Sequence, residues 1–226
     1  MLGLQYLHEI DTLLAILTSH VKISTKNGWT DAAKYSEIIF TPILTTIFNK
    51  KFELLEFRRK DMEAVDVGCD ELGIAFQITA TTGIKKVKKC IDVYLKNRVY
   101  EKYPKLYILV IDEISQPKYK KIVEYIDSTA KELNIELPKE FSFTISENYW
   151  NISILSNQIR ERLSSPNKLS FIKNILNEQY NLSINQSTED EVLNTVINSM
   201  NKEIVKRKSI YESLIYIIDI FDGISV

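Results

Sequence analysis

The sequence has few of the residues from which zinc sites and imidazole chemistry are built. Its 226 residues include two cysteines, Cys69 and Cys90, and two histidines, His8 and His20. The cysteines do not have metal-ligand spacing, so we expect no structural zinc site. Two free thiols are typical of a reducing compartment.

Long hydrophobic runs and an excess of one charge are also missing. No apolar run approaches the roughly 18 residues of a membrane-spanning helix, and the N-terminal stretch MLGLQYLHEIDTLL lacks the basic segment of a signal peptide. We therefore expect a cytoplasmic protein with no membrane partner. The formal net charge of −1 excludes a global basic field, so a nucleic-acid partner would need a local basic patch.

The hydrophobic period changes along the chain. Apolar residues recur at helical spacing in residues 2–22 and from about 30 to 48, where Pro42 should kink or divide the helix. Strand patterns and further helices follow. We predict strands at 52–57, 64–68, 73–80, 106–111 and 141–145, and helices at 84–100 and 119–133. After residue 149 only helical patterns remain.

This order predicts an α/β fold with two regions. Residues 1–148, with the N-terminal helix 2–22 included, form the α/β domain. Residues 149–226 form a helical C-terminal region, whose apolar end at 209–221 suits a partner or dimer interface. There is no internal repeat or low-complexity tract.

The segments 64–68 and 73–80 should form a hairpin around the polar turn 69–72. A turn symmetric about Glu71 and Leu72 brings opposite residues within contact distance. It pairs Val67 with Phe76, Asp66 with Gln77, and Val65 with Ile78. The two-residue period then puts the four hydrophobic residues on one face, and Asp66 and Gln77 together on the other with Thr79.

The pattern of a strand with Asp, a short turn, a strand with Glu or Gln, and a helix resembles the core of the PD-(D/E)xK nuclease superfamily, which includes restriction endonucleases. Many members also carry a glutamate on the preceding helix, and Glu37 in KYSEIIFTPILTTIF holds that place. AVDVG and IAFQITA, followed by a lysine-rich helix, are most similar to the SMEK-type domain of bacterial antiphage defence proteins. The resemblance covers roughly residues 30–115 and implies a restriction-endonuclease-like mixed sheet flanked by helices.

The resemblance implies metal-dependent hydrolysis of phosphodiester bonds with Mg²⁺ or Mn²⁺. Asp66 would be the main metal ligand, Gln77 a neutral ligand through its amide oxygen, and Glu37 a direct or water-bridged ligand. DNA is favoured over RNA as the nucleic acid. A homo-oligomer is expected because nucleases of this superfamily are often dimers.

One residue departs from the superfamily pattern, which expects lysine where this chain has Thr79. Threonine cannot stabilise the charge of the transition state. Lys85 or Lys86, at the start of the next helix, could reach back with a long side chain and act in its place. Alternatively, the site is degenerate, and the chain is a nucleic-acid- or protein-binding module that docks a partner such as an NTPase or sensor protein. A third reading is an unrelated α/β domain in which Asp66 is purely structural.

Two basic segments flank the proposed site. Lys88 and Lys89 continue the lysine run of the helix, which is either a solvated face or a set of phosphate contacts near the helix N-terminus. Arg58, Arg59 and Lys60 could add to the same patch from the segment before Asp66. We predict nucleic-acid contacts for these five residues.

Overall fold

The computed structural model of the chain describes residues 2–28, 31–55, 64–81, 83–112 and 121–186. The chain divides into two compact units, Met1–Glu178 and Gln179–Val226. The first unit contains the whole sheet. Residues 149–178, which the sequence pattern groups with the helical C-terminal region, lie in this first unit and contribute a strand to its sheet.

Five strands of the described residues form one mixed sheet in the order β1-β2-β3-β4-β5. The first three are antiparallel neighbours, whereas β4 is parallel to β3 and to β5. Their bounds are β1 Glu53–Leu54, β2 Val67–Cys69, β3 Ile74–Thr79, β4 Lys105–Val110 and β5 Tyr149–Trp150. The parallel pairing of β3 and β4 brings their carboxyl ends to the same edge of the sheet.

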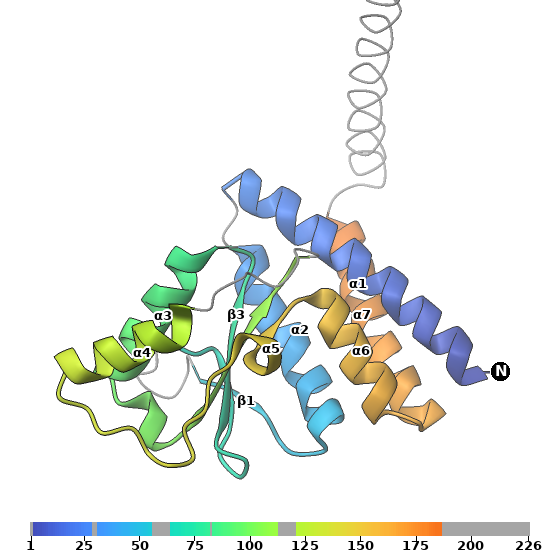
Figure 1. The fold of residues 1–226 in the computed structure, drawn as a ribbon. Coiled ribbons are helices and arrows are strands. Elements are labelled where there is room, and N and C mark those ends of the chain that lie inside the picture. Colours follow the sequence, from blue (N-terminus) through green and yellow to red (C-terminus); the bar gives the residue numbers. More distant parts are fainter. Residues whose placement is uncertain (1, 29–30, 56–63, 82, 113–120, 187–226) are drawn as a thin grey trace, which may run out of the picture. The chain divides into compact units, whose positions relative to one another are not determined.

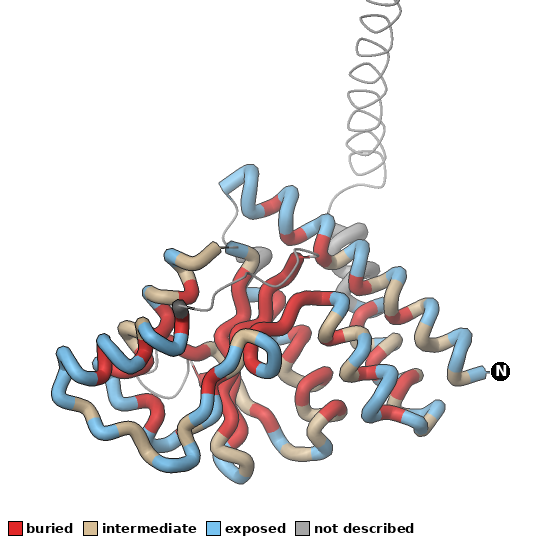
Figure 2. The backbone as a smooth tube through the Cα atoms, in the orientation of Figure 1, coloured by how far each residue is buried: buried red, intermediate tan, exposed pale blue. Residues whose placement is uncertain are grey.

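Helices cover both faces of the sheet (Figure 1). One side carries α1 (Leu2–Lys26), α2 (Asp31–Phe48), α6 (Ile152–Arg162) and the part of α7 (Pro166–Gln186) that belongs to the first unit. The other side carries α3 (Ile84–Lys96) and α4 (Lys121–Glu132). The short elements η2 (Val99–Glu101) and α5 (Ile145–Asn148) lie in the connections. This arrangement buries the central strands on both faces, as the burial colours of Figure 2 show.

The alternation of side chains along β4 divides the core into two clusters. Leu106, Ile108 and Val110 pack with α3 and α4. Leu109, together with Phe76 of β3, packs with the helices of the opposite side. Neighbouring strand residues point to opposite faces. A continuous apolar run such as LYILVI therefore packs against helices on both faces of the sheet.

The predicted mixture of helices and strands is confirmed, with three local corrections. Residues 141–144 contain no strand, and the short helix α5 (Ile145–Asn148) begins directly after them. Strands do not stop at 149, since Tyr149 and Trp150 pair with β4. Pro42 does not divide its helix, because α2 runs through it from Asp31 to Phe48.

The described helices do not meet the requirements of a bilayer span. None of them is both long enough and apolar enough to cross a membrane.

Candidate functional site

The β2–β3 hairpin has the register expected from its turn. Val67 lies opposite Phe76, and Gly68 lies opposite Ala75. The ladder ends earlier than predicted, because β2 begins at Val67 and the chain bends at Asp66. The bend turns Val65 to the opposite face, where it packs on the α3 side of the sheet. The predicted pairing of Val65 with Ile78 on one apolar face is therefore wrong.

The bend places the Asp66 side chain against the end of β3. Its Oδ2 accepts hydrogen bonds from the Gln77 amide nitrogen and from the Ile78 backbone N–H, each at 2.5 Å. Its own backbone is fixed as well, because its N–H donates to Phe76 (2.9 Å) and its carbonyl accepts from Leu55 (2.8 Å). Hydrogen bonds to a charged group each contribute about 1.5–3 kcal/mol. The predicted contact between Asp66 and Gln77 thus exists, and it orients the carboxylate.

Gln77 is 7% exposed, and within the described residues only the nitrogen of its side-chain amide forms hydrogen bonds. Its Nε2 donates to Asp66 Oδ2 and, at 3.2 Å, to the carbonyl of Ile78. Both partners are acceptors, so the amide orientation is fixed with the nitrogen toward them. Its Oε1 receives no hydrogen bond from the described residues. A buried carbonyl oxygen without a donor costs about 1–3 kcal/mol, which marks a position where a ligand or water can bind.

Glu37 approaches the sheet from α2, which packs against β3. Its side chain is buried at 8% exposure, and its backbone carbonyl accepts a hydrogen bond from the Thr41 hydroxyl at 2.7 Å. Buried glutamates are rare unless they have a partner. Glu37 has such an interaction, and it is therefore not the solvated helical glutamate that is common on surfaces.

Thr79, at the position where the superfamily pattern has lysine, is buried. Its hydroxyl oxygen accepts a hydrogen bond from the Thr81 N–H at 3.1 Å. The side chain therefore caps the end of β3. It supplies no positive charge to Asp66.

The two candidate replacement lysines differ in exposure. Lys85 is exposed, whereas Lys86 is half-buried one helical turn before Cys90. The Cys90 thiol donates to the carbonyl of Ala64, two residues before Asp66, at 3.3 Å. Burial raises the pKa of Cys90 to about 12, the charge of Asp66 also raises it, and the charge of Lys86 lowers it. Lys86 is one helical turn from Cys90, whose thiol contacts the segment just before Asp66, and this placement favours Lys86 over the exposed Lys85.

The predicted phosphate contacts are only partly within the described residues. Lys88 lies over the ring of Tyr125, 4.1 Å from its centroid, and so links α3 to α4. Lys89 is exposed. Arg58, Arg59 and Lys60 lie outside the described residues.

A second carboxylate, at the edge of the sheet where β3 and β4 end, was not identified from the sequence. Asp112 follows β4, is 5% exposed, and forms an ion pair with Lys22 of α1. Its backbone is fixed by a hydrogen bond from the Ile152 N–H at 3.2 Å. The signal was an aspartate directly after the apolar run LYILVI, since residues that follow parallel strands commonly line sites in α/β folds.

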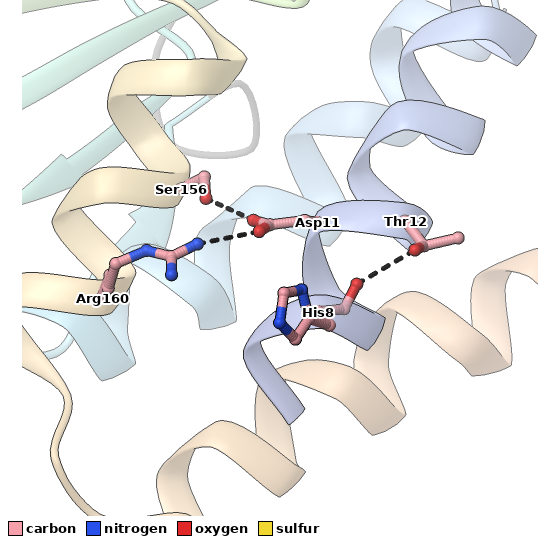
Figure 3. A network of polar contacts seen from close by, with 5 residues as sticks. All are labelled: His8, Asp11, Thr12, Ser156 and Arg160. Atoms are coloured by element: carbon pink, nitrogen blue, oxygen red, sulfur yellow. Dashed lines mark hydrogen bonds and ion pairs between the residues drawn. The ribbon is translucent and has the colours of Figure 1, made fainter. Parts of the chain in front are cut away.

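A second polar cluster contains a serine, a histidine and an aspartate, but it has a structural role (Figure 3). Asp11 of α1 accepts hydrogen bonds from Ser156 and from Arg160 of α6, the latter at 2.9 Å. His8 contributes only its backbone carbonyl, which accepts from Thr12 at 3.0 Å. Because the serine donates directly to the carboxylate, no imidazole activates it. The cluster joins α1 to α6.

The described residues contain no group of three or more His, Cys, Asp or Glu side chains that could hold a metal. The metal ligands predicted from the sequence are two carboxylates, of Asp66 and Glu37, and the amide oxygen of Gln77. They contain only two side chains of these four types. The donor types suit a hard cation, which prefers oxygen ligands. The observation that fits a cation is Gln77 Oε1, which lies beside Asp66 and accepts from no residue in the described part of the chain.

Comparison with known proteins identifies one family. Searches of curated proteins and of solved structures give no match. The family model of the SMEK domain matches residues 9–160, which include most of α1, all elements from α2 to β5 and most of α6. Asp66, Gln77 and Glu37 lie within the match. The chain therefore belongs to the SMEK domain family.

Proposed function

We propose that this chain is a metal-dependent nuclease of the PD-(D/E)xK superfamily that hydrolyses phosphodiester bonds as a component of a bacterial antiphage defence system. The amide oxygen of Gln77, which is buried beside the oriented carboxylate of Asp66 and receives no hydrogen bond from the described residues, carries the proposal. The mixed sheet with helices on both faces is compatible with a restriction-endonuclease-like arrangement.

Each side chain has a defined role in this proposal. Asp66 and the Gln77 amide oxygen would hold Mg²⁺ or Mn²⁺, and Glu37 would complete the oxygen ligands. A bound cation would polarise the phosphate and lower the pKa of the attacking water. The Gln77 amide nitrogen and the Ile78 N–H hold Asp66 in place. Lys86 would stabilise negative charge on the phosphate, in place of the missing lysine at position 79.

The test is cleavage of supercoiled DNA, linear DNA and RNA in Mg²⁺ or Mn²⁺. Wild type should cut at least one substrate, and Asp66→Ala should be at least about 100-fold slower, because several kcal/mol of transition-state stabilisation depend on the cation. Asp70→Ala, at the other end of the same hairpin, is the matched control and should cut like wild type. Equal cleavage by wild type and Asp66→Ala would show that the site is wrongly assigned.

The buried, uncharged Thr79 favours a second candidate function, a catalytically degenerate nuclease fold that binds nucleic acid or a partner protein. Calorimetry separates the two candidates. Heat of Mn²⁺ binding that is lost in Asp66→Ala supports the nuclease. Tight nucleic-acid or protein binding without any Mn²⁺ heat supports the binding module.

A further inference from the structure

We propose that Lys22 contacts a phosphate of the bound nucleic acid, and that the buried Asp112 holds it at the carboxyl edge of the sheet. This inference rests on the proposed function, and it adds a residue of α1 to the site. Thr79 supplies no positive charge at this edge of the sheet, so a phosphate bound there needs a cation from another residue.

The sheet brings Asp112 close to Thr79. Thr79 lies opposite Val110 in the parallel ladder, and the Ile111 N–H donates to the Thr79 carbonyl at 2.8 Å. The chain then turns tightly, because the Asp112 N–H donates to the Val110 carbonyl at 2.9 Å. With ordinary strand spacings, Asp112 lies within about 8 Å of Thr79. The Lys22 ammonium, which pairs with Asp112, is therefore near the position that lacks a lysine.

Burial of Asp112 fixes the position of Lys22. The Asp112 side chain is 7% exposed, and the Lys22 side chain is 44% exposed. The Lys22 ammonium lies against this carboxylate, and a buried carboxylate favours a cation at such close range. The lysine ammonium has three donors, and an aspartate does not use all of them. Lys22 is thus a half-exposed cation in a fixed position, as phosphate recognition requires.

A second pair in the same unit provides the control. Lys102 pairs with Asp70 at 2.8 Å, and its side chain is also 44% exposed. This pair lies at the opposite edge of the sheet, because Asp70 follows β2 at the hairpin turn and Lys102 precedes β4. The two lysines therefore match in exposure and in partner type and differ in their distance from Asp66.

The test compares two double variants, Lys22→Met/Asp112→Asn and Lys102→Met/Asp70→Asn, with wild type. Each removes both charges of one ion pair and leaves the net charge unchanged, so both should fold. Binding of labelled DNA and RNA is measured by fluorescence anisotropy with Ca²⁺, over a range of salt concentrations. Thermal unfolding confirms that the variants are folded.

The expected result is a loss of one phosphate contact in the Lys22 variant. The slope of log K against log salt should fall by about 1, and affinity should weaken for every sequence tested. The Lys102 variant should keep the wild-type slope. Asp112→Asn alone retains the Lys22 charge and should keep the wild-type slope, but it should weaken affinity because the lysine is no longer held in position. Unchanged affinity in this variant would overturn the role of Asp112.

Two results would overturn the inference, and they differ in what else they remove. If wild type binds nucleic acid and the Lys22 variant has the same slope and affinity, the inference fails and the proposed function stands. If wild type binds neither DNA nor RNA, the proposed function and the inference fail together.

Discussion

The two ends of the β2–β3 hairpin each carry an aspartate, and the two carboxylates are used differently. At the turn, Asp70 accepts hydrogen bonds from the Tyr103 hydroxyl at 2.5 Å and from Lys102. The hydrogen bond to Asp70 is the main reason that the pKa of Lys102 is raised. At the open end, Asp66 accepts from Gln77 and Ile78, and the Gln77 amide oxygen beside it receives no hydrogen bond from the described residues.

This difference indicates which end is built for a ligand. The carboxylate at the turn is 54% exposed and pairs with Lys102. The open end combines a carboxylate held by two N–H donors with a buried oxygen to which no described residue donates. Protein interiors rarely leave such an oxygen unsatisfied, so the open end is where a cation is expected.

The largest expected effect is on Mn²⁺ affinity when the two aspartates are exchanged for alanine. Asp66→Ala should weaken Mn²⁺ binding at least about 100-fold, because it removes the charged ligand. Asp70→Ala should leave the affinity unchanged. Isothermal titration calorimetry measures both, and equal losses in the two variants would remove the distinction between the ends of the hairpin.

The next effect is on stability and compares the two lysine–aspartate pairs. Lys22→Met removes a cation that pairs with the buried Asp112, and it should cost about 2 kcal/mol. Lys102→Met leaves Asp70 largely exposed, and it should cost less than about 1 kcal/mol. Chemical denaturation gives both free energies of unfolding. A larger cost for the Lys102 variant would show that the Asp112 pair is not a buried one in solution.

The proposed role of Gln77 predicts a smaller effect that depends on the cation. Gln77→Glu puts a second carboxylate beside Asp66, so it should lower the melting temperature in chelator and raise Mn²⁺ affinity about tenfold. Gln5→Glu is the control, because Gln5 donates to Glu9 at 2.9 Å on the exposed face of α1. Its stability should not respond to Mn²⁺. If the melting temperature of Gln77→Glu also fails to respond to Mn²⁺, the side-chain oxygen at position 77 is not a metal ligand.

The smallest expected effect is a pH dependence that comes from Cys90. Burial raises the pKa of this thiol to about 12 from an ordinary value of 9.0. A raised pKa favours the protonated form in the fold, so the contribution to stability is present below pH 9 and is lost as the pH rises toward 12. Cys90→Ala should therefore lose less stability than wild type between about pH 7.5 and pH 10. Parallel losses in urea denaturation would contradict the burial of this thiol.

The register of the site hairpin could be predicted because its turn is short and polar. A symmetric turn leaves one register for Val67 and Phe76, and the two-residue period then brings Asp66 to Gln77. The buried strand β4 could be predicted from its continuous apolar run for a similar reason. In both segments, local pattern and tertiary environment agree.

The remaining features depend on contacts between distant segments. The bend at Asp66 exists because its carboxylate, instead of a strand carbonyl, accepts from the Ile78 N–H. The pairing of Lys22 with Asp112 requires α1 and the end of β4 to meet at one edge. The two-residue strand β5 is defined only by its pairing with β4. No periodicity within a single segment encodes these contacts.

The most direct test of the cation site is a crystal structure of the protein grown with Mn²⁺, with anomalous data at the manganese edge. The account predicts one anomalous peak within about 2.5 Å of both an Asp66 carboxylate oxygen and Gln77 Oε1. Full Mn²⁺ exposure with no peak there, and with Gln77 Oε1 bonded to a protein donor or a water, would contradict it.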